Sequence, residues 1–446
     1  MIDAYPVSDF RPGGKLYYIF SKLSGFFILK RLVYPFLLIC ASGSCASAQS
    51  YSDFFDDATL RVDYTLAGSD TSQHVFFNEL LSLPHWCGRR VNLSSAPVHG
   101  NGQVLVTDVR TGEVIYANGF STLFQEWVHY DEASLFPRSF EGVALVPMPK
   151  SPARVTLRLF DSRREVAAEA SRLVDPSDVL IRKVGLVDVP DYERILKADD
   201  DEACIRVAIL AEGFTEPEMP HFMDKAREAV EAIFAHPPFD AARGKFDIVA
   251  VKAVSAQSGV SEPSRHKWLS TVAGAHFDSF YAERYLTTLR LRRVHDALAG
   301  VPYDHIIILA NTPVYGGGGI LNFYTMSSTD NEWFRPVIVH EFGHAFAGLA
   351  DEYAYEGDTP PMYPQDVEPW EPNITTLVDI ESKWKDMEGV GSSCGKVGTY
   401  EGAGYSLKGV YRPAPNCRMR DNRTRDFCPV CQRAIKLVIE RLTRQM

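Results

Sequence analysis

Two histidines and a glutamate stand within five residues, and their types and spacing suit metal-assisted hydrolysis. His340 and His344 are four residues apart, so on a helix both imidazoles face one way and can bind the same cation. A zinc ion with three protein ligands keeps a fourth position for water and lowers the pKa of that water to about 7. Glu341 would take the water's proton and pass it to the leaving amine. Packing alone explains the group poorly, because three buried polar side chains would then need other partners.

The third zinc ligand must come from the residues that follow the second histidine. Gly348 allows the chain to reverse, after which Asp351 can return to the metal. Glu352 is the rival for this position. In the extended pattern of metzincin-type proteases the third ligand comes six residues after the second histidine, whereas Asp351 comes seven after His344. The sequence therefore leaves both carboxylates open and favours Asp351.

A helix over about 334–348 would position the two histidines. Apolar residues from Ile338 to Leu349 recur at intervals of four, three and four, which is typical of one helix face. Pro336 suits a first helical turn, and Gly348 suits a helix end.

Strands and helices alternate before this segment, which predicts an α/β catalytic domain with the zinc helix beneath a twisted sheet, as in zincin-like enzymes. The expected elements are strands at 205–210, 247–254 and 305–310, a helix beginning at Thr215 and Pro217, and a helix from 277 to about 298.

A glycine-rich segment, 315–325, precedes the zinc helix. Its four consecutive glycines exclude a regular helix and permit close backbone approach. Residues 320–325 would form an edge strand beside the cleft, where Gly318, Gly319 and Ile320 could contact an extended peptide. A flexible loop is the alternative. No helix-opening phosphate motif follows, so a nucleotide is not an expected partner.

The chain divides into an all-β sandwich domain at 49–180 and a catalytic domain at 181–446. Short β-branched or aromatic runs predict the sandwich, and Arg110-Thr111-Gly112 resembles a hairpin connection. The runs lie at 59–64, 103–109, 113–116 and 154–160.

Length and charge restrict the class of protein further. At 446 residues the chain is long enough for two or three domains, and its net charge of −11 argues against a nucleic-acid partner. Residues 1–48 have the order of an export signal, with Lys30-Arg31, an apolar run and a small-residue cleavage site at Ala46-Ser47-Ala48. The protein is thus expected in the periplasm, at the cell surface or outside the cell. Membrane contact is expected only if this segment is retained as an anchor or lipidated.

Cysteine usage fits export but allows more than one interpretation. Six cysteines follow the signal segment, an even number that suits disulfides in an oxidising compartment. The cysteines at 394, 417, 428 and 431 could instead form a closed structural zinc site, because Cys428-Pro429-Val430-Cys431 has ligand spacing. Free thiols are the third possibility.

Several motifs together resemble the bacterial IgA-peptidase family of zinc metalloendopeptidases. The resemblance covers roughly 180–440, and the preceding β domain fits that family's N-terminal domain. The matching segments are Ala211-Glu212-Gly213-Phe214-Thr215, 315–319, 340–344 leading to 349–353, Tyr411-Arg412-Pro413, Cys417-Arg418-Met419 and 427–431.

The resemblance implies a metzincin-related catalytic domain that hydrolyses peptide bonds in proteins or peptides. It implies that His340, His344 and Asp351 bind one Zn²⁺, that Glu341 is the base and that Met419 forms the Met-turn beneath the metal. An ordinary core methionine is the alternative for Met419. A tyrosine that follows the zinc helix, Tyr405 or Tyr411, would help to hold the oxyanion.

Two other functions remain possible from the sequence. The chain can be a catalytically silent surface-binding protein of the same fold, although the intact Glu341 argues against this. It can also be a zinc amidase that acts on cell-wall material. The sequence does not decode the natural substrate, immunoglobulin A included.

Overall fold

The computed structural model describes residues 50–355 and 362–446. The predicted export signal, 1–48, lies outside the described residues. Within the described part, no helix is both long and apolar enough to cross a membrane.

Two four-stranded sheets make up the N-terminal part, in the orders β5-β1-β2-β8 and β4-β3-β6-β7. The predicted runs coincide with strands, although Val109 and Glu113 lie just outside β3 and β4. Arg110-Thr111-Gly112 lies in the connection between these strands, and the Gly112 N–H donates to Asp108 O at 2.8 Å. The arrangement is consistent with the predicted β-sandwich. The elements are β1 (Phe55–Gly68), β2 (Gln73–Leu83), β3 (Gly102–Asp108), β4 (Val114–Phe120), β5 (Arg138–Pro149), β6 (Ala153–Phe160), β7 (Val166–Val174), β8 (Arg182–Lys183), α1 (Tyr51–Phe54), α2 (Leu123–Trp127) and α3 (Glu132–Leu135).

Strand β1 packs on both of its faces. Its residues from Leu60 to Leu66 alternate across the strand, and the even-numbered ones enter the hydrophobic core. On the other face, Arg61 is also buried, because its guanidinium pairs with Asp63 at 2.7 Å and with Asp296 at 2.6 Å. Asp296 belongs to the second half of the chain, so the two halves are in direct contact at this strand.

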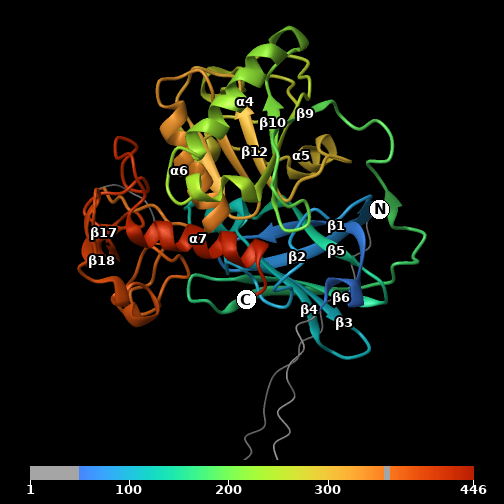
Figure 1. The fold of residues 1–446 in the computed structure, drawn as a ribbon, viewed down its shortest axis with the longest axis horizontal. Helices are drawn as coiled ribbons and strands as arrows, with labels where there is room; N and C mark the ends of the chain where they lie inside the picture. The colour runs from blue at the N-terminus through green and yellow to red at the C-terminus, as the bar shows by residue number, and fades with distance from the viewer. Residues whose placement is uncertain (1–49, 356–361) are drawn as a thin grey trace, which may run out of the picture. The chain divides into compact units, whose positions relative to one another are not determined.

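A six-stranded mixed sheet follows, in the order β13-β14-β12-β10-β11-β9 (Figure 1). Strands β14, β12, β10 and β11 run parallel, while β13 and β9 are antiparallel edge strands. The strands predicted at 205–210, 247–254 and 305–310 are confirmed, although the second ends at Val251. The bounds are β9 (Tyr192–Leu196), β10 (Ile205–Glu212), β11 (Phe246–Val251), β12 (His305–Ala310), β13 (Gly317–Ile320) and β14 (Tyr324–Ser328).

Three long helices accompany this sheet: α4 (Met219–Ile233), α6 (Phe334–Ala347) and α7 (Pro429–Thr443). Helix α6 is the predicted zinc helix; it contacts β13 and β14 on one side and α4 and α7 on others. It ends where Gly348 adopts a left-handed conformation, φ 61°, as the sequence predicts. The start predicted for α4 is also confirmed, since Thr215 and Glu218 form a capping box before it.

Two local predictions are wrong. The helix expected from 277 to about 298 is present only as α5 (Leu291–Ala297). Before it, Asp278 and Phe280 have left-handed backbone, and His276 pairs with Thr287 through two backbone hydrogen bonds, so this stretch forms a loop. The edge strand expected at 320–325 is displaced. Residues 317–320 form edge strand β13, residues 321–323 form a turn with Asn322 at φ 53°, and Tyr324 and Thr325 begin the neighbouring strand β14.

The rest of the C-terminal region contains two small hairpins, β15–β16 and β17–β18, between α6 and α7. Their bounds are β15 (Gly391–Ser392), β16 (Gly395–Lys396), β17 (Tyr400–Ala403) and β18 (Ser406–Arg412). The 3-10 turns are η1 (Glu216–Glu218), η2 (Asp240–Lys245), η3 (Pro263–Arg265), η4 (Ser279–Tyr281), η5 (Ile380–Ser382) and η6 (Lys385–Met387).

Candidate active site

Three possible metal-binding atoms converge beside helix α6. The Nε2 atoms of His340 and His344 lie 3.1 Å apart. Oδ1 of Asp351 lies 3.1 Å from the first and 3.2 Å from the second. The chain reversal at Gly348 brings Asp351 back to the helix, as predicted from the sequence.

Each imidazole is oriented by a hydrogen bond on its far side. Nδ1 of His340 lies 3.1 Å from Arg418 O, and Nδ1 of His344 lies 2.5 Å from Leu349 O. A carbonyl oxygen can only accept, so both Nδ1 atoms carry a hydrogen, and each ring would bind a metal through its Nε2 lone pair. Oδ1 of Asp351 is buried and has no hydrogen-bond partner among the described residues. Three acceptors thus face one another, an arrangement that a cation would satisfy.

The donor set fits zinc. Nitrogen and carboxylate oxygen bind zinc at about 2.0–2.2 Å, and around a tetrahedral centre such atoms lie about 3.3–3.5 Å apart. The observed separations of 3.1–3.2 Å are close to that spacing. Burial alone would raise the pKa of Asp351, but His344 and His340 outweigh it and hold that pKa well below its usual range. The carboxylate is therefore ionised, as a metal ligand must be.

Glu341 lies beside the two histidines. A carboxylate oxygen of Glu341 and the ring nitrogens of His340 and His344 all lie within 4.8 Å of one another. Its side chain is half-buried and lines the cleft. Burial raises the pKa of Glu341, while the two imidazoles act in the opposite direction.

Glu352, the rival third ligand, turns away from the histidines. Its Oε1 accepts hydrogen bonds from Asn373 Nδ2 and Cys431 Sγ, both at 3.0 Å.

The two tyrosines proposed for the oxyanion occupy different places. The hydroxyl of Tyr405 donates to Oδ2 of Asp351, so Tyr405 contacts the candidate ligand itself. Tyr411 does not line the cleft; its backbone pairs with Thr375, at 2.8 and 3.0 Å, on strand β18. Of the two tyrosines, Tyr405 is therefore the one that the described structure brings to the candidate site.

Met419 lies against the middle of α6. Its side chain is fully buried, and a Cβ atom added at Gly343 would meet its Sδ at 3.0 Å. Gly343 stands between the two histidines on the helix, so the thioether supports the helix where the candidate ligands project. This is the position that a Met-turn would take.

A cleft of about 1540 Å³ opens over these residues. Strand β13 lines it through Gly318, Gly319 and Ile320, the residues predicted to contact a peptide. A Cβ atom at Gly319 would lie 2.2 Å from Glu341 O, so only glycine lets this strand approach α6 so closely. The cleft exceeds the roughly 300–1,000 Å³ typical of small-molecule pockets, which favours an extended ligand.

The N-terminal half of the chain also contributes to the cleft, which the sequence did not predict. Glu126, on α2, lines it and accepts hydrogen bonds from Tyr285 at 2.6 Å and Tyr130 at 3.4 Å. Burial raises the pKa of Glu126 to about 7. The sequence around Glu126 carries no local signal for this role, because its partner Tyr285 is 159 residues away.

The cysteine predictions need correction. All six described cysteines are buried and unpaired, so the expected disulfides are absent from the described chain. Cys394 lies outside the group that the other three C-terminal cysteines form. Sγ of Cys394 donates to Asp426 O at 3.4 Å. The fourth member of the group is Glu352, which lies beside Cys417, Cys428 and Cys431.

Comparison with known families agrees with the geometry. Residues 194–394 and 389–439 match the family described as IgA Peptidase M64, and residues 50–170 match the one described as Peptidase M64 N-terminus. A peptidase domain preceded by an N-terminal domain defines the chain as a peptidase. The match covers more than half of the chain, which therefore belongs to the IgA peptidase M64 family, and the resemblance seen in the sequence is confirmed. No curated protein matches the chain.

Proposed function

We propose that this peptidase is a zinc-dependent endopeptidase in which His340, His344 and Asp351 bind one catalytic zinc ion. The observation that carries the proposal is the convergence of two imidazole nitrogens and a carboxylate oxygen, separated by 3.1–3.2 Å. The Nδ1 atom of each imidazole is already hydrogen-bonded to a backbone carbonyl, so the Nε2 atoms are the ones that face the site. When bound there, zinc would supply an acidified water and polarise the scissile carbonyl.

Glu341 is the general base of the proposal. Its position within 4.8 Å of the imidazole nitrogens lets it receive a proton at the site and return it to the leaving amine. Tyr405, through its hydrogen bond to Oδ2 of Asp351, orients that carboxylate so that Oδ1 faces the histidines.

A zincin-like, metzincin-related fold for the catalytic domain is part of the same proposal. It is supported by the packing of α6 against β13 and β14 and by the contact of Met419 with the helix at Gly343.

The substrate would be a protein or peptide bound in extended form. Edge strand β13 lines the cleft beside Glu341, and an extended peptide can add to such an edge by main-chain hydrogen bonds. Strand addition requires chain on both sides of the scissile bond, which favours cleavage within a chain.

Export completes the proposal and is supported by sequence alone. Residues 1–48 would direct the protein out of the cytoplasm, with cleavage after Ala48. The amino-terminal sequence of the protein recovered from cell fractions tests this: a start at Gln49 supports it, and an intact leader in the cytoplasm contradicts it.

Cleavage of an unfolded protein such as casein tests the activity. The purified protein should produce internal fragments, lose activity with a chelator and recover it when zinc is returned. Release of single terminal residues would contradict the endopeptidase assignment. Chelator-insensitive cleavage would contradict the metal dependence, and absence of cleavage with zinc bound would favour a binding role.

A further inference from the structure

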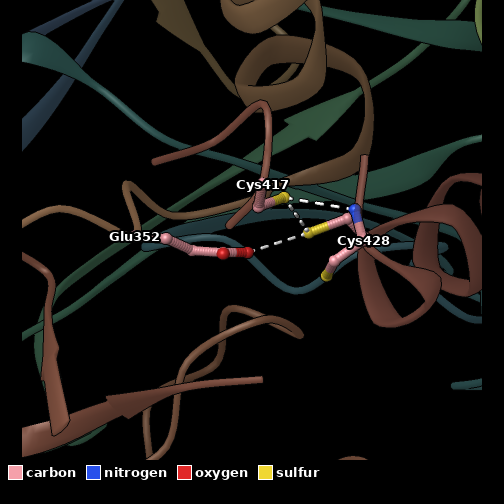
Figure 2. A group of neighbouring side chains, drawn as sticks. Glu352, Cys417 and Cys428 are labelled. Carbon is pink, nitrogen blue, oxygen red and sulfur yellow. Dashed lines mark hydrogen bonds between the residues drawn. The ribbon is translucent and has the colours of Figure 1, made fainter. Parts of the chain in front are cut away.

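Three cysteines and a glutamate form a second group of possible metal ligands. Glu352, Cys417, Cys428 and Cys431 are all fully buried, and one ligand atom from each lies within 4.8 Å of the others. Figure 2 shows the carboxylate of Glu352 and the sulfur of Cys417 turned toward the segment that holds Cys428. The group is separate from the candidate active site, which takes Asp351 and leaves Glu352.

The spacing of the sulfur atoms suits a metal better than a disulfide. Sγ of Cys417 and Sγ of Cys431 are 3.7 Å apart. Thiolates that bind zinc at about 2.3 Å lie about 3.8 Å apart around a tetrahedral centre, whereas a disulfide requires about 2.05 Å. An odd number of cysteines would also leave one thiol over if two of them paired.

Glu352 is the member that most needs a cation. None of the ion pairs among the described residues includes it. Its Oε1 accepts from Asn373 and Cys431, and its Oε2 has no hydrogen-bond partner within residues 50–355 and 362–446. A buried carboxylate without a positive partner is costly, and a divalent cation among the four side chains would remove that cost.

The first turn of α7 favours thiolates at this place. Cys428 is the N-cap residue of the fifteen-residue helix and Cys431 lies in its first turn, where the partial positive charge of the helix stabilises anions. The Cys428 N–H also donates to Sγ of Cys417 at 3.3 Å. Pro429 occupies the first helical position, where a backbone N–H would have no partner within the helix.

We propose that Glu352, Cys417, Cys428 and Cys431 bind a second, structural zinc ion. Four protein ligands fill a tetrahedral shell and leave no position for water, so this site would stabilise the fold and take no part in hydrolysis. Thiolates and a carboxylate together suit zinc, and binding would release the protons of the thiols.

The second ion would hold together the segments that orient the active site. Cys417 precedes Arg418, whose carbonyl accepts from His340, and Met419, whose carbonyl accepts from the Glu352 N–H at 2.8 Å. Glu352 follows Asp351 directly. The site would therefore join the start of α7 to both chain segments that position the candidate catalytic ligands.

Metal analysis of the full-length protein tests the proposal. The wild type should contain two zinc ions per chain, and Cys431→Ser and His344→Ala should each contain one. Cobalt in His344→Ala should give thiolate-to-metal charge-transfer absorption in the near ultraviolet, which Cys431→Ser should lack. Cys204→Ser, the same change at a buried cysteine outside the group, should keep both ions.

A measurement on the unaltered protein covers the case in which Cys431→Ser does not fold. Titration with an organomercurial, which displaces zinc from thiolates, should release one zinc ion while the other stays bound. The proposal would be overturned if the organomercurial released no zinc. It would also be overturned if the wild type held a single zinc ion that His344→Ala lacks, or if any two of the three cysteines formed a disulfide. The proposed function is tested separately, because loss of activity or of the His344-dependent ion leaves the thiol-bound ion unchanged.

Discussion

The Nδ1 atom of His340 lies 3.1 Å from the carbonyl oxygen of Arg418, a residue 78 positions further along the chain. His340 is on α6, whereas Arg418 is in the loop before α7. The helix brings the two imidazoles together, but a distant loop fixes the orientation of the His340 imidazole. Disturbance of that loop should therefore alter the proposed zinc site even though the loop contributes none of its three proposed ligands.

Tyr405→Phe should weaken zinc binding at the catalytic site. The change removes only the hydroxyl that donates to Oδ2 of Asp351, and loss of such a partner typically costs about 10-fold to 100-fold in metal affinity. Competition with a chromophoric chelator measures the affinity. Tyr411→Phe is the matched control, because Tyr411 lies outside the cleft. Equal affinities in the two variants would contradict the positioning role of Tyr405.

Gly319→Ala should separate β13 from α6. The new Cβ would lie 2.2 Å from Glu341 O and 2.8 Å from His344 Cβ, and overpacking of this kind costs about 1–3 kcal/mol. Chemical denaturation should show that loss, together with reduced peptide cleavage. Gly391→Ala is the control, since a Cβ there meets no atom within 4 Å. Similar unfolding free energies for both variants would show that the close approach is unnecessary.

His236 should make the fold sensitive to mild acid. Burial, reinforced by Arg418 and Arg425, lowers the pKa of His236 from 6.5 to about 4. Between these two values the unfolded chain binds the proton and the folded chain does not, so stability is complete above pH 6.5 and falls as the pH drops toward 4.

The comparison with His236→Gln isolates this effect, because glutamine does not titrate. Between pH 7 and 4.5 the wild type should lose about 1–2 kcal/mol more of its unfolding free energy than the variant. Denaturation curves at both pH values provide the measurement. Parallel losses in the two proteins would show that His236 keeps its ordinary pKa.

Local patterns were sufficient for the elements that carry the ligands. The apolar spacing around His340 predicted α6 to within a residue at each end, and the buried run at 305–310 predicted β12. The prediction of a helix after 277 was wrong because tertiary pairing of His276 with Thr287 outweighs local propensity there.

Contacts between distant residues were beyond the reach of sequence patterns. Ligand spacing marked Cys428 and Cys431, but Cys394 is replaced by Glu352, and only the reversal of the chain after α6 brings that carboxylate to the cysteines. Glu126 reaches the cleft from the N-terminal half for the same kind of reason. No periodicity or motif encodes either contact.

The most direct test of the central claim compares wild type with Glu341→Gln for zinc content and casein cleavage in the same preparations. Zinc content should be unchanged and cleavage should fall about 10²- to 10⁴-fold, because the variant loses the base and keeps every proposed ligand. Glu332→Gln, the same change at another carboxylate lining the cleft, should stay within a few-fold of wild type. Undiminished cleavage by Glu341→Gln, with zinc retained, would contradict the account.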